Sequence, residues 1–519
     1  MKQKRKVNEV LILCRNICGK SGSTLISEGV FATALKGDDS PQKHYEDTIK
    51  AGFELNIKKL ARILTREAPK RILELEEFGV SLEKVNNELF IFQSPGHSKP
   101  RSVKVKFRTS ILKGPYIIHP LRLYCKRLGV KIYDLHEVIK LISINDEVYG
   151  CIAINKLNNE IIVFISKATI LATGGLGYIY KLTDNTSDIT GSGYALAYEV
   201  GAKLIDMEFV QFYPLYMLKP ISGILIPTSV LCYGAKLINR LGERFMHKYD
   251  AIRRECTTRD ILSRVIFNEV IEGRGVNEGI YVDLSNMDSM YMNIVNYLLS
   301  LPRLKNVDLR KCRILVSPVA HFMVGGVLID EQCETSVRNL YACGEVVGGV
   351  HGASRLAGNA LSKAVVFGAR AGYYAALKAK EARTPKITMT EINEALEEFK
   401  LDDHDYRVEA LNAILKELRE YMWSNVGIVR SEESLRNMLS YINGVWDELE
   451  LIKVSNLKNL IKLIKLKHMV KVAEIITKSA LLRGESRGVH YRIDYPNIDN
   501  SWLKHIIVDK NEISIKSID

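Results

Sequence analysis

Two short β-rich runs that each stop in glycine restrict the fold of this chain more than any other feature. They are Thr169-Ile-Leu-Ala-Thr-Gly-Gly-Leu-Gly177 and Asn339-Leu-Tyr-Ala-Cys-Gly-Glu345. A glycine directly after a buried strand lets a ligand approach the backbone closely and exposes backbone amides to it. The acid at the end of the second run could accept a ribose hydroxyl. Taken alone, each run is also typical of an ordinary tight turn.

A third glycine-rich segment lies near the amino terminus. Lys20-Ser-Gly-Ser-Thr-Leu-Ile-Ser-Glu-Gly29 follows a β-rich run over residues 9–14. Small hydroxyl residues and glycines after a strand suit contacts with phosphate or with the edge of a flavin ring, although a plain polar loop has the same composition. Such β-rich runs alternate with helical stretches over the first 200 residues, for example the amphipathic segment 55–78. This alternation predicts an α/β layer structure.

The pattern of polar, apolar and turn-forming residues changes after Pro214. Up to about Leu315 turns are more frequent and the pattern is mixed, whereas residues 339–344 again resemble a buried strand. We interpret this stretch as a domain inserted into the α/β domain. Pro385 marks a further boundary, after which residues 390–482 are mostly helical and a polar tail closes the chain.

The composition is that of an ordinary globular protein. The chain has 519 residues, 47% of them apolar, and 73 Lys and Arg against 60 Asp and Glu give a net charge of +13. These values exclude disorder, collagen and a coiled-coil rod, and the length exceeds what one hydrophobic core usually serves. The basic balance predicts acidic partners. Part of this positive charge lies on one predicted helix, where a basic face is formed by Lys458, Lys462, Lys465 and Lys471. This face is either solvated or in contact with an acidic partner or a membrane surface.

The cysteines and the lengths of the apolar runs indicate the cellular compartment in which the protein is expected. The nine cysteines are odd in number and scattered, and they contain no Cys-x-x-Cys pair. This pattern predicts reduced intracellular thiols and neither a disulfide framework nor a zinc site, so we expect no metal. No run approaches 18 uncharged apolar residues. We therefore expect a cytoplasmic protein, or one bound peripherally to the inner face of the cell membrane.

Many short motifs occur in one order along nearly the whole chain, and together they resemble the flavoprotein subunits of succinate dehydrogenase and fumarate reductase and their relative L-aspartate oxidase. Besides the three segments above, the motifs include Asp39-Ser-Pro-Gln-Lys-His-Tyr-Glu-Asp47, Asp206-Met-Glu-Phe-Val-Gln-Phe-Tyr-Pro214, Thr258-Arg-Asp260, Ala320-His-Phe-Met-Val-Gly-Gly326, His351-Gly-Ala-Ser-Arg-Leu-Ala-Gly-Asn359 and Glu485-Ser-Arg-Gly-Val-His-Tyr-Arg492.

The resemblance implies an α/β fold in which an FAD-binding Rossmann-like domain carries an inserted α+β capping domain and is followed by a helical domain. The expected boundaries are an FAD-binding domain over 1–212 and 323–384, a capping domain over 213–322, a helical domain over 385–485 and a tail over 486–519. The resemblance also implies that the cofactor is non-covalent FAD and that the partner is an iron-sulfur subunit, with no nucleic acid.

In that family, bound FAD exchanges a hydride at its N5 with a dicarboxylate. Carried over by motif, Arg259 shuttles the proton, while His321 and Arg355 hold carboxylate groups and Tyr213 and Thr228 line the substrate site. A planar guanidinium grips a carboxylate in a bidentate manner, and a cation beside the reacting carbon stabilises developing enolate charge. The implied cofactor-binding residues are Ser21, Gly22, Ser23, Thr24, Gly29, Ala172, Thr173, Gly174, Gly175, Glu345, Asn359 and Leu361.

Outside its motif, each of these residues also has a purely structural reading. Arg259 could pair with Asp260 at the start of a helix, and His321 could be a hydrogen-bonded core histidine.

The sequence departs from the family pattern at several positions. No strand with a Gly-x-Gly-x-x-Gly turn precedes residues 10–14, so about 30 residues of the fold, the length of a βαβ unit, are expected to be absent. Either the start was assigned too late, or another polypeptide supplies the unit, or cofactor binding has been lost. Ser23 stands where dehydrogenases place the histidine joined to FAD, which implies non-covalent flavin. Tyr213 replaces a substrate histidine and Thr228 an active-site glutamate. Ser192 replaces an aspartate of a Thr-Gly-Asp-Gly turn. Two further departures are Leu231-Cys-Tyr-Gly234 in place of Arg-Gly-Glu-Gly and Ala360 in place of a flavin-contacting serine.

Three functions remain open from the sequence. The first is an FAD-dependent oxidoreductase of the succinate dehydrogenase and fumarate reductase type, acting on a dicarboxylate-like acid. The second is an amino-acid oxidase of the L-aspartate oxidase type. The third is a non-catalytic, truncated homologue, which the missing glycine turn favours and the retained Arg259, His321 and Arg355 oppose.

Overall fold

The glycine-terminated runs form two neighbouring parallel strands. The computed structural model describes residues 9–517 apart from 95, 108–111, 288–291, 293–294, 296–297, 300–303, 306, 384 and 386. Strand β11 (Thr169–Leu171) pairs in parallel with β19 (Leu340–Ala342), and β1 (Leu11–Leu13) pairs in parallel with β7 (Lys131–Tyr133). Parallel strands need long crossover connections, and helices supply part of them here. The α/β fold expected from the sequence is therefore confirmed.

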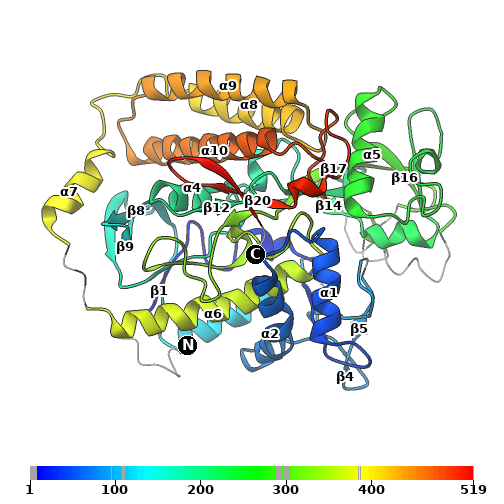
Figure 1. The fold of residues 1–519 in the computed structure, drawn as a ribbon, viewed down its shortest axis with the longest axis horizontal. Coiled ribbons are helices and arrows are strands. Elements are labelled where there is room, and N and C mark those ends of the chain that lie inside the picture. The colour runs from blue at the N-terminus through cyan, green and yellow to red at the C-terminus, as the bar shows by residue number, and fades with distance from the viewer. Residues whose placement is uncertain are drawn as a thin grey trace.

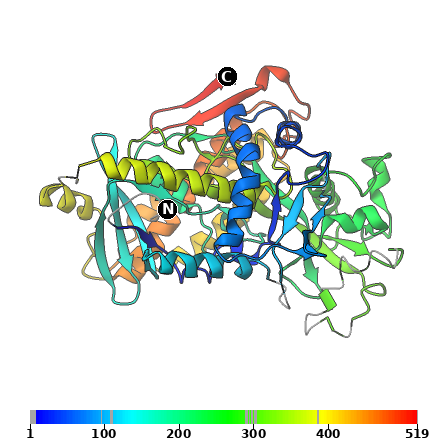
Figure 2. The same ribbon diagram turned by 90° about the horizontal axis from the view of Figure 1, so that it is seen from below.

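Long helices and an antiparallel sheet surround these strands. Helix α6 (Asn359–Glu381) packs across α2 (Lys58–Glu77), as Figures 1 and 2 show. The sheet consists of β8 (His136–Ile144), β9 (Glu147–Asn155) and β10 (Glu160–Ile165), and β8 and β9 join through the tight turn at Asn145 and Asp146, which have positive φ. The other elements of this part are α1 (Pro41–Ala51), β2 (Val30–Ala32), β3 (Lys84–Val85), β4 (Glu88–Leu89), β5 (Ile91–Phe92), β6 (Ser102–Lys104), α3 (Pro115–Arg127) and α4 (Ser192–Glu199).

A second sheet with its own core forms the cap, which we define as residues 210–323. Its two long strands, β13 (Val210–Lys219) and β17 (Ile314–Met323), are antiparallel, and α5 (Arg259–Ile271) packs on them. The cap core is separate from the main core and contains buried residues such as Met217, Leu262 and Val316. In Figure 1 the cap lies at the right, beside α1. The other strands of this sheet are β14 (Ile224–Leu225), β15 (Lys236–Ile238) and β16 (Ile280–Asp283).

Three long helices form a layer on the opposite side of the strands from α6 (Figure 1). Ser431 caps α9 reciprocally with Ser434, and Asn456 caps α10 by accepting a hydrogen bond from the Asn459 N–H. Helix α10 buries residues on most of its surface, as expected for a helix packed on several sides. The helices are α8 (Ala410–Asn425), α9 (Glu432–Leu451) and α10 (Leu457–Leu482), and the shorter α7 (Met389–Glu397) precedes them.

The basic face expected on α10 is only partly solvated, because two of its lysines contact other side chains. Lys458 and Lys462 are exposed. Lys465 is half-buried and lies over the ring of Tyr178, and Lys471 bonds Glu474 at 2.8 Å.

The last segment of the chain forms part of the folded body. Strand β20 (Lys504–Val508) pairs with β21 (Ile513–Ser517) and with β12 (Leu204–Ile205), which in turn pairs with β18 (Gly326–Val327). The tail strands thus join a sheet that leads directly into the cap strands β13 and β17, and Figure 2 shows them along one side of the molecule. Within the described ranges, no helix is long and apolar enough to cross a membrane.

The expectation that all cysteines are reduced thiols is wrong for one pair. Cys232 and Cys256 form a disulfide between Cα atoms 4.7 Å apart, while Cys14, Cys18, Cys125, Cys151, Cys312, Cys333 and Cys343 are free. The fold of the cap brings the two cysteines together across 24 residues of sequence, a separation that has no local signature. Among the described residues, no group of His, Cys, Asp and Glu could hold a metal ion.

Candidate active site

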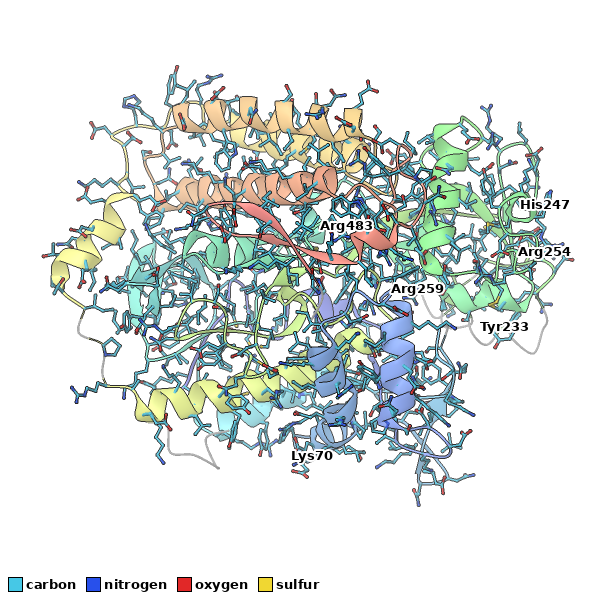
Figure 3. All side chains as sticks on the ribbon, viewed as in Figure 1. Lys70, Tyr233, His247, Arg254, Arg259 and Arg483 are labelled. Carbon is cyan, nitrogen blue, oxygen red and sulfur yellow. A yellow bond between two sulfur atoms is a disulfide. The ribbon has the colours of Figure 1, made fainter. Side chains whose placement is uncertain are left out.

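Residues from three elements of the cap meet at one point. Tyr213 on β13 and His321 on the neighbouring strand β17 have ring centroids 5.3 Å apart. Arg259 is the first residue of α5, and its guanidinium lies over the Tyr213 ring, 4.7 Å from the centroid. Figure 3 places Arg259 where the cap meets α1. The strand pairing and the start of one helix thus bring together the expected proton shuttle, Arg259, and two of the expected substrate-site residues, Tyr213 and His321.

An acid that the sequence analysis missed holds His321. Asp184 Oδ2 lies 2.6 Å from Nδ1 of His321, and the next residue, Asn185, donates from Nδ2 to the His321 carbonyl oxygen at 3.0 Å. A carboxylate at one ring nitrogen fixes the orientation of the imidazole and directs the other nitrogen toward a ligand. Asp184 lies in an irregular loop 137 residues before His321, so no spacing rule identifies it.

Tyr213 presents its ring to Arg259 while its hydroxyl group is occupied elsewhere. The hydroxyl donates to the carbonyl oxygen of Ile226 at 3.0 Å, and the backbone of Thr228 also hydrogen-bonds it. Thr228 is buried and begins a short 3-10 helix over Thr228–Tyr233. Burial raises the pKa of Tyr213 far above its ordinary value. Tyr213 and Thr228 are therefore adjacent, and Tyr213 acts here as a platform for the guanidinium.

Arg355 is a second buried cation near this cluster. Its guanidinium lies 4.4 Å from the ring centroid of Phe322, and its Nε has no hydrogen-bond partner among the described residues. Burial, and next the charge of Arg259, lower the pKa of Arg355 to about 9. In the part of the chain that the structure describes, neither arginine forms an ion pair with a carboxylate. The charges of Glu345, Asp184 and Glu28 act on Arg355 without forming an ion pair. Two neighbouring guanidinium groups without an ion-pair partner suit an anionic ligand such as a carboxylic acid.

The glycines after β11 and β19 enclose Glu345. A Cβ added at Gly175 would lie 2.1 Å from Glu345 Oε1, and Gly174 and Gly344 have positive φ angles of 76° and 78°. Glu345 Oε1 accepts the Met323 N–H at 3.0 Å, and burial raises the pKa of Glu345. Close backbone approach beside an acid matches what the sugar and phosphate groups of a dinucleotide require, so these residues fit FAD.

The other predicted cofactor residues lie after β11, near the amino terminus and at the start of α6. Ala172 and Thr173 follow β11 directly, and a Cβ at Gly193 would clash with Thr173 Oγ1 at 1.8 Å. Ser23 donates to Asn185 Oδ1 at 3.1 Å, which brings the amino-terminal loop beside the His321 strand.

The amino-terminal loop and the start of α6 hold the remaining positions. Gly22 has a φ of 87° and open space at its Cβ position, and it belongs to the loop formed by Ser21, Gly22, Ser23 and Thr24. Gly29, in contrast, packs against Val105. Asn359 is buried between His44 and Thr48, and Leu361 is half-buried beside it on α6.

Comparison with known proteins agrees with this geometry. The family model for the FAD binding domain matches residues 10–361, and the model for the fumarate reductase flavoprotein C-terminal region matches residues 415–519.

Three relatives show the range of the similarity. An uncharacterized FAD-dependent oxidoreductase of Methanocaldococcus jannaschii is 40% identical over 98% of this chain and 94% of its own length. A fumarate reductase (CoM/CoB) subunit of Methanothermobacter marburgensis is 38% identical over 96% of this chain and 92% of its own. An L-aspartate oxidase of Synechocystis is 32% identical over 96% of this chain and 92% of its own.

Solved structures extend the match to three dimensions. FrdA of the E. coli quinol fumarate reductase superposes with a TM-score of 0.88 at 25% identity, covering 100% of this chain and 93% of its own. Mycobacterium smegmatis Sdh1 gives a TM-score of 0.86 at 29% identity, covering 98% and 90%. The glycine cradle, the FAD-binding model and these relatives agree, and the chain is an FAD-dependent oxidoreductase that belongs to the family of fumarate reductase and succinate dehydrogenase flavoprotein subunits and L-aspartate oxidases.

Proposed function

We propose that this chain is the catalytic flavoprotein component of an enzyme of the fumarate reductase and succinate dehydrogenase type, which acts on a dicarboxylate-like acid and exchanges electrons with an iron-sulfur subunit. The observation that carries the proposal is the cluster of Arg259, Tyr213 and His321 beside the buried Arg355. The two guanidinium groups lack carboxylate partners among the described residues, so they are suited to hold an acid.

Each side chain in the cluster has a role that follows from its chemistry. Bound FAD supplies a hydride acceptor or donor. His321, oriented by Asp184, and Arg355 would bind the carboxylates of the substrate, and Arg259 would deliver or remove a proton at the carbon next to the reacting one. The ring of Tyr213 would keep the Arg259 guanidinium in place, because a cation is attracted to the face of an aromatic ring.

The partner and the place of action are also proposals. One relative of this chain is named as a fumarate reductase subunit and another belongs to a quinol fumarate reductase, so a second, electron-carrying polypeptide is the partner that we expect. Such a complex would bring the chain to the inner face of the cell membrane as a peripheral component. An L-aspartate oxidase activity is the second candidate, because relatives with that name match more than 90% of the chain.

The cofactor should be released by acid. Ser23 stands where dehydrogenases place the histidine joined to FAD, and a serine cannot form that histidyl bond, so precipitating the yellow holoprotein with acid should leave the flavin in the supernatant. The measurement is the visible spectrum of supernatant and pellet, with free FAD treated in the same way as the control. Yellow colour that stays with the washed pellet would contradict non-covalent binding.

The Tyr213 ring should matter more than its hydroxyl group. Tyr213→Leu removes the platform under Arg259 and should lower kcat about three- to thirtyfold, the value of one cation–π contact, whereas Tyr213→Phe should keep most of the activity. The assay is steady-state turnover of fumarate, succinate and L-aspartate with artificial electron donors or acceptors. Tyr495→Leu removes a similar platform, under Arg492, away from the site and is the matched control. Equal loss in the Leu and Phe variants would assign the role to the hydroxyl instead.

A further inference from the structure

Lys363 is a buried cation in the second turn of α6. It has no exposed surface, and its Nζ donates to the carbonyl oxygen of Val347 at 2.8 Å. The same ammonium lies 5.3 Å from the ring centroid of Phe322, on the strand that also carries His321. Burying a lysine is costly when no acid compensates its charge, so such a residue is a candidate for a functional role.

The surroundings of Lys363 neutralise its charge only partly. Among the described residues, no carboxylate lies within ion-pair distance, and the acid whose charge acts on it is Glu345. The other titratable groups around it are Arg355, His351 and Cys343. Both ring nitrogens of His351 lack partners among the described residues. Burial lowers the pKa of Lys363 to about 7 and raises that of Glu345.

Lys363 and the cap strand hold the Glu345 turn from two sides. This turn is the 3-10 helix Gly344–Val346, and Met323 on β17 donates its N–H to the Glu345 carboxylate at 3.0 Å. Lys363 bonds the carbonyl oxygen of Val347, the residue that directly follows the turn. Resting on the assignment of Glu345 to FAD, we propose that Lys363 is a positioning residue of the cofactor site, which fixes this turn and keeps Glu345 ionised so that it can accept a hydroxyl group of FAD.

The affinity for FAD tests this role without any turnover assay. Lys363→Met should weaken FAD binding about tenfold or more, the effect of losing a hydrogen bond made by a charged group. Lys363→Gln keeps an N–H donor for the Val347 carbonyl but no charge, so its smaller loss measures the effect of the charge, and the difference from Lys363→Met measures the positioning part. The dissociation constant comes from quenching of flavin fluorescence as FAD is added to apoprotein. Lys380→Met, an exposed lysine on the same helix, is the matched control and should bind FAD normally.

Two further measurements show whether Lys363 acts through Glu345. In the Glu345→Gln background, Lys363→Met should cause a smaller additional loss than in the wild type, because the charge that it supports is already gone and only the hydrogen bond to Val347 is lost. In the wild type, the affinity for FAD should fall as the pH rises above about 7, since the ammonium loses its proton there, and this alkaline decline should be absent from both Lys363 variants. A fall on the acid side would belong to Glu345, whose pKa is raised.

The outcomes separate the proposals from each other. Unchanged FAD affinity in Lys363→Met, fully additive losses in the double variant, or a wild-type affinity that stays constant above pH 7 would each overturn the role of Lys363. The pH profile needs no variant, so the proposal remains testable even where Lys363→Met fails to fold. A wild type that binds FAD but turns over no dicarboxylate would contradict the proposed function and leave this test intact.

Discussion

Replacing Arg259 with alanine should lower kcat by about two to four orders of magnitude while changing KM much less. A guanidinium that passes a proton during hydride transfer acts mainly in the transition state, so its loss appears in turnover rather than in substrate binding. Its position over the Tyr213 ring, at the very start of α5, fixes the direction of the group. The measurement is steady-state turnover with an artificial electron acceptor, corrected for bound flavin.

Companion variants make this result specific. Arg259→Lys keeps the charge but loses the planar fork and should remain well below wild type. Arg264→Ala removes another arginine of α5, which stacks on Tyr491, and should leave kcat nearly unchanged. Arg355→Ala and His321→Ala should raise KM as well as lower kcat, because these groups would hold the carboxylates of the bound substrate. Near-normal turnover of Arg259→Ala with full flavin content would remove the proton-shuttle role.

The sequence is a good guide where the function depends on local backbone geometry. Both runs that end in glycine are parallel strands, and they lie next to each other as β11 and β19. Their glycines are predictable because only residues without a side chain allow the contact between Gly175 and Glu345. The cap and the helical layer are likewise visible as changes of pattern along the chain.

The features that the sequence analysis missed are made by contacts between distant segments. Asp184 belongs to an irregular loop and meets His321 only because the fold brings that loop to β17. The Cys232–Cys256 disulfide depends in the same way on the folding of the cap. The α10 lysines recur in a regular pattern along the sequence. In the structure, however, Lys465 packs against Tyr178 and Lys471 pairs with Glu474. Periodicity identifies a face of a helix, whereas tertiary contacts determine what covers it.

A buried ionic network around Arg483 connects the helical layer, the tail and the start of the cap. Arg483 follows α10 directly and has no exposed side-chain surface, and its Nε lies 2.5 Å from Glu208 Oε1, just before β13. It also donates to Glu485 at 3.2 Å and to the carbonyl oxygens of Trp502 and Lys504 in the tail. Figure 3 shows Arg483 beneath α10, next to the tail strands. One side chain thus joins the segment before β13 to the end of α10 and to the tail.

Arg483→Met should therefore lower the free energy of unfolding by about 3–5 kcal/mol, because it leaves the Glu208 carboxylate buried without its partner, whereas Glu485 keeps its bidentate pair with Arg487. Arg436→Met, which removes an exposed pair with Glu432 on α9, should cost less than about 1 kcal/mol and serves as the control. Urea denaturation measures both values. Since Arg483 also bonds the carbonyl oxygens of Trp502 and Lys504, limited proteolysis should show earlier cleavage in the tail of Arg483→Met. A loss no larger than that of the control would mean that the network contributes little to stability and that packing alone joins the tail to the cap.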